Sequence, residues 1–338
     1  MVSIKDVAER CEVSIATVSK ALNNHNDVSE NTKRLIKQTA DELGYLPNSQ
    51  ARALKTNRTY SIGVIYADKS GTGIAHAYFS QVLESFRAEA ERLGYDITFI
   101  NNRNIGDRSM SYLEHCKYRN VDGVAIVCAD FYDSNVTAII NSDIPLVTID
   151  FISEKTYSVS SDNAMGIKRL VEYVVSQGHR NIAYIYGDSS QVTTNRLDSF
   201  KATLESLNIK SNVDYVRQSK YHDPISASKI TKEMLSLYNP PTCIIAPDDY
   251  SAIGVMNAIR QLGLSVPNDV SVIGYDGTYL SQIFERPLTT IRQNIQLIGE
   301  RSAQMLIKLI NKQSISEKER HLIVGGELLT GETVKTIK

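Results

Sequence analysis

The stretch SIATVSKALN, residues 14–23, predicts a short helix with a polar start and an apolar inner face. Ser14 is a residue type that caps helices, and Val18 and Leu22 lie four positions apart, which places them on one side of a helix. Ile15 falls on the other side, at the first position of the helix. A large apolar side chain that points away from a small core has no packing role there. We therefore expect this helix to present its N-terminal residues to a partner.

Two further short helices are predicted around this one. Ser3 and Asp6 form a capping-box pattern at the start of IKDVAERCE, and Ser29 can cap ENTKRLIKQTADELG, which ends at Gly44. The expected inner face of the third helix consists of Leu35, Ile36, Thr39 and Leu43. Two short helices joined by a tight turn and braced by a third predict a helix-turn-helix domain over residues 1–46.

Residues 47–59, PNSQARALKTNRT, predict a linker that contains one short helix. Pro47 cannot continue the preceding helix, and Asn48 can cap a helix from Ser49 to Leu54. A helix of this length is marginal on its own. We expect a hinge that becomes ordered when a partner holds it.

From residue 60 onward, short runs rich in β-branched residues alternate with amphipathic helical patterns. The expected strands are YSIGVIYA, YDITFIN, VDGVAIVC, IPLVTID, NIAYIYG, PTCIIAP and VSVIGYD. Alternation of this kind predicts α/β architecture, with parallel sheets covered by helices on both faces. About ten strands are many for one sheet. Residues 60–338 are therefore expected to form two doubly wound lobes, and the chain is expected to pass from the first lobe to the second near residue 160.

Composition and charge are those of an ordinary globular protein. The chain has 338 residues, of which 42% are hydrophobic and 22% charged, and a net charge of −1. Residues 1–58 contain nine Lys and Arg against seven Asp and Glu, so a slightly basic head precedes an acidic body. The whole chain is therefore not a general binder of polyanions, although its head has the right sign for nucleic acid.

The sequence also predicts a cytoplasmic protein without a membrane partner. No apolar run approaches the length of about 18–20 residues that a membrane span needs. The charged N-terminus MVSIKDVAER lacks the apolar centre of a secretion signal. The cysteines show neither close pairing nor metal-type spacing, which favours reduced and mostly buried thiols at Cys11, Cys116, Cys128 and Cys243.

Several stretches carry a resemblance to one known family. IKDVAERCEVSIATVSKALN and VSENTKRLIKQTADELGYLPNSQARALK resemble the DNA-binding head of the LacI/GalR transcriptional regulators. GHRNIAYI, PDDYSAIGVMNAIRQLGLSVPNDVSVIGYD and PLTTIRQN resemble the family's effector-binding body. The resemblance covers essentially the whole chain in the expected order. It implies a homodimeric repressor with a body like a periplasmic sugar-binding protein, in which a small molecule changes the affinity for operator DNA.

The resemblance further implies that the chain crosses between the two lobes of the body three times, near Ser161, Arg292 and His321. The expected N-terminal lobe comprises about residues 60–160 and 293–321, and the C-terminal lobe about residues 161–292 and 322–338. A two-fold dimer of such chains would bind a palindromic operator with half-sites about one helical turn apart.

An α-helix fits the major groove of DNA, and its N-terminal side chains can reach base edges. By resemblance, Ile15, Ala16 and Lys20 occupy base-reading positions, while Thr17 and Ser19 occupy positions that bond phosphates. Ile15 and Ala16 offer no side-chain hydrogen bond, so they can contact only apolar groups such as thymine methyls. Lys20 can donate to guanine. The alternative is that the three helices form a purely structural bundle.

The resemblance assigns a second DNA contact to the hinge. Leu54 would wedge into the minor groove, at a cost of a few kcal/mol for unstacking the bases. Arg52 and Lys55 flank it, and Ser49 opens the same short helix, so these residues are expected to contact DNA with it. Packing of Leu54 against the body is the alternative.

Polar residues that follow predicted strands indicate a ligand site, because ligands of two-lobed α/β proteins bind at the carboxyl ends of strands. Asp150, Asp248 and Asp276 stand at such positions, and carboxylates accept hydrogen bonds from hydroxyl groups. By resemblance, Arg196 is the residue that grips the ligand. A stacking face for a sugar ring, or alternatively core packing, is expected of Phe79, Phe131, Phe151, Tyr221 and Tyr275. Asp249 is expected to cap the following helix rather than bind the ligand.

No pattern in the sequence indicates an enzyme, a cofactor or a metal site. GTGIAH at residues 71–76 lacks the third glycine of a dinucleotide fingerprint, and no phosphate-binding loop or nucleophile elbow is present. The expected function is a repressor controlled by a small carbohydrate-like effector. Three alternatives stay open at this point: a sugar-binding transport receptor, an enzyme of sugar metabolism, and a regulator whose co-effector is a phosphoprotein that docks on the body.

Overall fold

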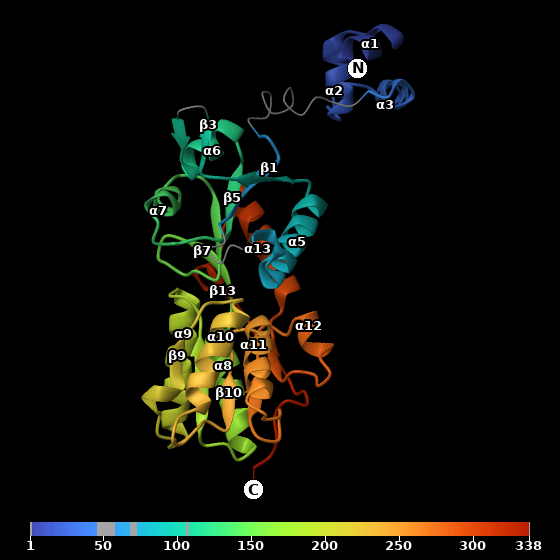
Figure 1. Cartoon of the computed structure of the whole chain (residues 1–338). Helices are drawn as coiled ribbons and strands as arrows, with labels where there is room; N and C mark the ends of the chain where they lie inside the picture. Colours follow the sequence, from blue (N-terminus) through green and yellow to red (C-terminus); the bar gives the residue numbers. More distant parts are fainter. Residues whose placement is uncertain (1, 46–57, 68–72, 106–107, 338) are drawn as a thin grey trace. The chain divides into compact units, whose positions relative to one another are not determined.

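The computed structural model describes residues 2–45, 58–67, 73–105 and 108–337. The chain forms two compact units, Met1–Tyr60 and Ser61–Lys338 (Figure 1). The short hinge helix expected from Ser49 to Leu54 lies outside the described residues, and so do Arg52 and Lys55.

The first unit contains three helices: α1 (Ile4–Arg10), α2 (Ile15–Leu22) and α3 (Glu30–Leu43). Ser14 and Ser29 cap α2 and α3, because their hydroxyl oxygens accept the backbone N–H groups of Thr17 and Thr32 at 3.1 and 3.2 Å. The Ser3–Asp6 capping box and the left-handed end of α3 at Gly44 are also present. The predicted helix-turn-helix arrangement is confirmed.

The core of this domain is small and fully apolar at its centre, where Val7, Val18 and Ile36 are completely buried. The expectation that Leu35 lies on the inner face of α3 is wrong, because its side chain is 53% exposed. Thr39 is buried as expected, and Ala40, four residues after Ile36, completes the inner face in place of Leu35.

The second unit begins with a parallel six-stranded sheet in the order β13-β7-β6-β5-β1-β2. Its strands are β1 (Ser61–Tyr66), β2 (Asp96–Ile100), β5 (Gly123–Cys128), β6 (Leu146–Ile149), β7 (Tyr157–Ser161) and β13 (His321–Val324). The central strands β1, β5 and β6 are buried along nearly their whole length, as expected for a parallel sheet with helices on both faces.

Two pairs of helices cover this sheet. On one side α5 (Ala77–Arg92) and α13 (Ile295–Ile310) pack against each other, and α13 also contacts β5, β6 and β7. On the other side lie α6 (Tyr112–Arg119) and α7 (Ser134–Ile140), which contact each other (Figure 1). Three short elements complete this first lobe: η1 (Gly73–Ala75) and the antiparallel pair β3 (Arg103–Ile105) and β4 (Arg108–Met110).

The second lobe is built on a parallel four-stranded sheet in the order β11-β10-β8-β9. Its strands are β8 (Ile182–Tyr186), β9 (Val216–Gln218), β10 (Cys243–Ile245) and β11 (Ser271–Ile273). One apolar cluster joins the sheet to α8 (Asn163–Ser176) and α9 (Gln191–Ser206), and a second joins it to α10 (Pro224–Leu235) and α11 (Asp249–Gln261). The lobe also contains η2 (Val213–Tyr215) and α12 (Tyr279–Gln282).

The chain passes between the two sheets after β7, after β12 (Thr290–Arg292) and after β13. The last segment, β14 (Glu327–Leu329), pairs antiparallel with β12. The third crossing comes later than the expected boundary at residue 321, because β13 is still a strand of the first sheet up to Val324 and η3 (Glu317–Glu319) precedes it. The predicted two-lobed, doubly wound body is confirmed. No helix in the described part of the chain is long and apolar enough to cross a membrane.

Candidate functional site

In the first unit, α2 exposes the residues that are expected to contact DNA. The side chain of Ile15 is 44% exposed, although isoleucine is a residue type that folding normally buries. Ala16 and Lys20 are exposed as well, and Thr17 and Ser19 are partly exposed. These five residues therefore form a surface that other molecules can reach.

Two contacts within the domain organise this surface. The hydroxyl groups of Ser14 and Thr17 are 2.8 Å apart, so the cap residue also holds the Thr17 side chain. The Lys20 ammonium lies 2.5 Å from a carboxylate oxygen of Asp27. Because both groups of that pair are about half exposed, the ion pair is weak and Lys20 can exchange Asp27 for another acceptor.

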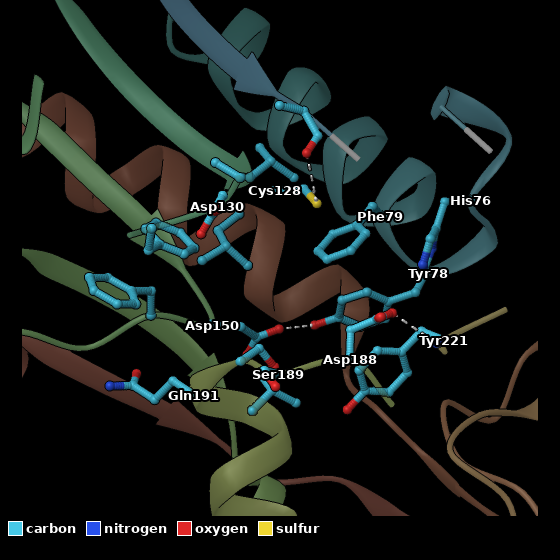
Figure 2. Close-up of a pocket in the computed structure, with 18 of the residues that line it drawn as sticks. His76, Tyr78, Phe79, Cys128, Asp130, Asp150, Asp188, Ser189, Gln191 and Tyr221 are labelled. Carbon is cyan, nitrogen blue, oxygen red and sulfur yellow. Dashed lines mark hydrogen bonds between the residues drawn. The ribbon is translucent and has the colours of Figure 1, made fainter. Parts of the chain in front are cut away.

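In the second unit, a pocket opens between the two lobes, where the carboxyl ends of the two sheets face each other. Its volume is about 210 Å³, and a cavity of about 150 Å³ is enough for one benzene ring. The first lobe contributes Tyr78, Phe79, Asp130 and Asp150, the second lobe contributes Asp188, Gln191, Arg196, Tyr221 and Asp276, and the segment that crosses after β12 contributes Gln293. Figure 2 shows Tyr78 and Asp150 together with Asp188 and Tyr221. The pocket therefore combines an apolar wall with a small set of polar groups, as ligand sites do.

Arg196, on α9, is the best-fixed polar residue of the pocket. Its Nε donates to the Asn163 side-chain oxygen at 2.7 Å, and one terminal nitrogen donates to the Pro247 carbonyl at 3.2 Å. Its guanidinium lies 3.6 Å from the centre of the Tyr275 ring, and only 4% of the residue is exposed. No carboxylate of the described residues forms an ion pair with Arg196. Because a buried charge without a partner is costly, this arginine is held ready for a ligand.

Asp276 follows β11, and it lines the pocket together with Arg196. Its Oδ1 accepts the Gln293 side-chain N–H at 2.7 Å, and its backbone has a φ of +105°, a strained value for a residue with a side chain. Burial raises the pKa of the Asp276 carboxyl well above its usual range, and the nearby Arg196 charge opposes this rise. A ligand that donates hydrogen bonds to the Asp276 carboxylate would lower its pKa, as the Arg196 charge does.

Asp150 occupies the corresponding place at the end of β6 in the first lobe. It accepts the Tyr78 hydroxyl at 2.7 Å and the Ser161 backbone N–H at 2.8 Å, and it also has a positive φ of 56°. Burial raises the pKa of this carboxyl, while these two hydrogen bonds and the Arg196 charge oppose the rise. Figure 2 shows the bond between Asp150 and Tyr78 at the centre of the pocket.

Aromatic rings form much of the remaining wall. Phe131 and Phe151 are stacked with their ring centres 4.0 Å apart and their planes 2° from parallel. At the opposite end, the rings of His76 from the first lobe and His222 from the second lie 3.6 Å apart and so join the two lobes. In the described part of the chain, no group of three or more His, Cys, Asp or Glu side chains could hold a metal ion.

Both units match known family models. Residues 3–48 match "Bacterial regulatory proteins, lacI family", and residues 171–334 match "Periplasmic binding protein-like domain". Among curated proteins, the HTH-type transcriptional repressor PurR of Histophilus somni (strain 129Pt) is 30% identical, and the match covers 100% of each chain. PurR of Serratia proteamaculans (strain 568) is 33% identical over 94% of this chain and 93% of that protein. This chain belongs to the lacI family of bacterial transcriptional repressors.

Solved structures agree with this assignment. The lac repressor dimer bound to operator and the anti-inducer ONPF has a TM-score of 0.83 and 28% identity, with 99% of each chain covered. A CelR–cellobiose complex has a TM-score of 0.71 over 98% of this chain and 100% of that chain, but at 22% identity it supports the fold alone. The lacI family consists of DNA-binding transcriptional repressors and not of enzymes.

The structure brings most of the selected effector residues of this lacI-family chain to the pocket. Phe79, Asp150, Arg196, Tyr221 and Asp276 line it, and so do Phe131 and Phe151. Tyr275 does not belong to the lining, because its ring lies beneath the Arg196 guanidinium and is only 1% exposed. Tyr275 therefore supports Arg196 from the core.

The expected roles of the two aspartates at the start of α11 are both wrong. Asp248 is the helix cap, because its oxygens accept the Ser251 N–H at 2.7 Å and the His222 N–H at 2.9 Å, and it does not line the pocket. Asp249 is fully buried and accepts hydrogen bonds from Thr278 and Thr290. Neither carboxylate is thus available in this structure as a ligand contact.

Several lining residues were not selected from the sequence. Tyr78, Gln191, His222 and Gln293 lie on helix starts or loops, so they do not share the strand-end position that identified Asp150 and Asp276. Asp188 does follow a predicted strand, β8, and the rule that selected Asp150 could have found it.

Proposed function

We propose that this lacI-family repressor binds a palindromic operator as a homodimer and that a small carbohydrate-like ligand in the interlobe pocket controls its affinity for the operator. The observation that carries this proposal is the buried Arg196, which has no carboxylate partner among the described residues and faces a pocket built from both lobes. Because both lobes line the pocket, the affinity for a ligand there depends on the angle between the lobes.

In this proposal, α2 enters the major groove with its N-terminal end. Ile15, Ala16 and Lys20 read base edges, and Thr17 and Ser19 bond the phosphates beside them. Their exposure supports these roles, and the weak Lys20–Asp27 ion pair leaves Lys20 free to exchange its partner. The hinge residues Ser49, Arg52, Leu54 and Lys55 add minor-groove contacts.

Exposed apolar side chains on the second lobe support the homodimer. The helices α10, α11 and α12 contact one another in sequence, and each exposes large apolar groups near its start. The exposed residues are Ile225, Tyr250, Tyr279 and Ile283, with exposures between 45% and 83%. Exposed apolar side chains grouped in this way are typical of protein–protein interfaces. The lac repressor structure bound to operator is likewise a dimer.

The carbohydrate-like effector is supported by the polar groups of the pocket. Carboxylates such as Asp150 and Asp276 can each accept hydrogen bonds from two hydroxyls, and Arg196 can donate to a further oxygen. The flat rings of Phe79 and Tyr221 provide apolar contact for a ring face. The CelR structure is a complex with cellobiose, a disaccharide.

Selection of DNA by the purified protein from a pool of random sequences tests the operator part of this proposal. We expect an enriched palindrome with half-sites about one helical turn apart. The Ile15→Ala variant should lose affinity for that palindrome by about tenfold, because base contacts of this size carry about 1–3 kcal/mol, and should bind random DNA as the wild type does. Leu35→Ala serves as the control, since Leu35 is also an exposed apolar residue of the same domain. Equal losses on both DNAs, or no palindrome, would contradict the proposal.

A further inference from the structure

Acidic side chains outnumber arginine and lysine in the lining of the pocket. Among the described lining residues, four are aspartates and one is an arginine, and none is a glutamate or a lysine. The aspartates are Asp130, Asp150, Asp188 and Asp276. Burial raises the pKa of Asp150 and Asp276, so a negative charge is costly at these two positions, and an anionic ligand would add a further one beside them.

Two neighbouring residues of the pocket leave acceptor oxygens unpaired. The side-chain oxygen of Gln293 is buried without a hydrogen-bond partner in the described structure, although only 5% of the residue is exposed. The Gln293 amide nitrogen already donates to Asp276, which receives no other side-chain hydrogen bond from the described residues. These two neighbouring residues therefore offer acceptor oxygens that a ligand donor can satisfy.

Some donors of the pocket are already occupied, whereas the His222 ring nitrogen Nε2 is buried without a hydrogen-bond partner among the described residues. The Tyr78 hydroxyl donates to Asp150, and Arg196 uses its Nε and one terminal nitrogen on Asn163 and on the Pro247 carbonyl. Arg196 retains three N–H groups for a ligand, but the described lining holds no lysine and no second arginine that could surround a phosphate group together with it.

One feature of the pocket would by itself favour an anion. The start of α9, at Ser190 and Gln191, opens on the pocket, and the first N–H groups of a helix attract negative charge. Asp188 stands immediately before this helix start and also lines the pocket. In addition, the Ser190 hydroxyl oxygen already accepts the Thr193 N–H at 3.1 Å. The positive end of α9 is thus opposed by a carboxylate.

We propose that the pocket selects an uncharged or cationic ring compound that is rich in hydrogen-bond donors and rejects the phosphorylated form of the same compound. This inference rests on the proposed function, since it names the ligand class of the same pocket. An unphosphorylated sugar and a free nucleobase both fit this chemistry, whereas a sugar phosphate and a nucleotide do not.

The test uses the purified full-length protein and a bacterial small-molecule extract below about 1 kDa. An anion-exchange column divides the extract into an unretained fraction, which is neutral or cationic, and a retained anionic fraction. We expect the unretained fraction to raise the melting temperature by about 2 °C or more and the retained fraction to leave it unchanged. Defined pairs follow in the same assay: glucose with glucose 6-phosphate, and adenosine with adenosine monophosphate.

Variants identify the cause of the selection. Asp188 is exposed at the pocket edge, so Asp188→Asn should fold normally and should reduce the preference for the unphosphorylated member of a binding pair by about threefold or more. Asp214→Asn changes another exposed aspartate of the same lobe, which pairs with Arg217 and does not line the pocket, and should leave the preference unchanged.

The outcomes separate this inference from the function on which it rests. A shift produced by the retained fraction, alone or equal to that of the unretained fraction, would overturn the ligand class and leave control by a small molecule intact. No shift with either fraction would overturn the proposed control by a small molecule and this inference with it. A shift confined to the unretained fraction would support both.

Discussion

Asp249 illustrates how a carboxylate beside the ligand site can serve the fold alone. It lies under the start of α11, where its oxygens accept the Thr278 N–H at 2.7 Å and the hydroxyls of Thr278 and Thr290 at 3.0 and 2.7 Å. These bonds connect α11 with β12 and with the start of α12. Because burial outweighs them, the pKa of Asp249 is raised to about 7.

The raised pKa predicts a pH dependence of stability. Between the pKa of the unfolded carboxyl, about 4, and the folded value of about 7, the folded state holds a proton that the unfolded state has released. The contribution of Asp249 to the free energy of unfolding should therefore fall as the pH rises from 4 to 7, by up to a few kcal/mol, and change no further above 7.

Urea unfolding at pH 5, 6, 7 and 8 checks this prediction. Asp249→Asn should make the dependence shallower, because asparagine does not titrate, and should leave the part contributed by Asp150 and Asp276. Asp214→Asn, at an exposed carboxyl, is the charge-matched control. The prediction fails when both variants keep the slope of the wild type.

At the level of single residues, sequence reasoning found the positions fixed by strand ends and by motif, such as Asp150, Arg196 and Asp276. It assigned the helix cap to Asp249 and not to Asp248, because a helix start inferred from sequence is uncertain by one residue, and that one residue decides which carboxylate meets the helix N–H groups. Gln293 could not be found, since a crossing segment that is distant in sequence brings it to Asp276.

Among the elements, α13 was not predicted from the sequence. Its 16 residues carry an apolar face that includes Ile298, Leu306 and Ile310, but Gly299 interrupts the helical pattern near its start. The reason for this glycine lies in α5, about 210 residues earlier in the chain. A Cβ on Gly299 would come within 2.6 Å of the Ser85 Cβ and of the Val82 carbonyl oxygen. The close contact of α5 with α13 thus requires a glycine that local rules disfavour.

The short strands β7, β9, β12 and β14 were missed for a related reason. Each has three to five residues, and β12 and β14 pair with each other across more than thirty residues. Their stability comes from partners that are distant in the sequence, and a short run carries too little periodicity to reveal them. The longer buried strands, such as β1 and β5, were found because their runs of apolar and β-branched residues are enough to indicate a strand.

The contact between α5 and α13 leads to a stability prediction. Gly299→Ala should lower the free energy of unfolding by about 1–3 kcal/mol, because an added methyl group must push the two helices apart. Gly325→Ala is the matched control, since an added Cβ there would meet no atom within 4 Å. Urea denaturation of both variants measures the effect. Equal stability of the two would show that the helices can separate without cost.

On the scale of the whole molecule, three crossings join two lobes around one pocket, and polar groups from both lobes line it. A ligand that contacts Asp150 in the first lobe and Arg196 and Asp276 in the second favours one relative position of the lobes. If that position changes the affinity for DNA, the operator must change the affinity for the ligand by the same factor. The two-lobed fold was predictable from strand–helix alternation. Whether the ligand raises or lowers the affinity for the operator depends on the free-energy difference between two arrangements of the lobes, and no sequence pattern reveals that difference.

A fluorescence-anisotropy titration of the selected palindrome measures operator binding by the first unit and its dependence on a ligand of the second unit. The wild-type protein and Arg196→Lys are titrated with and without the unretained small-molecule fraction, and Arg217→Lys, at an exposed arginine of the same lobe, is the control. Lysine keeps the charge but cannot reproduce the contacts of Arg196 with Asn163 and Pro247. We expect the fraction to change operator affinity by about fivefold or more in the wild type and the control, and to have little effect on Arg196→Lys. An equal change in Arg196→Lys, or no change in the wild type, would contradict control of operator binding through this pocket.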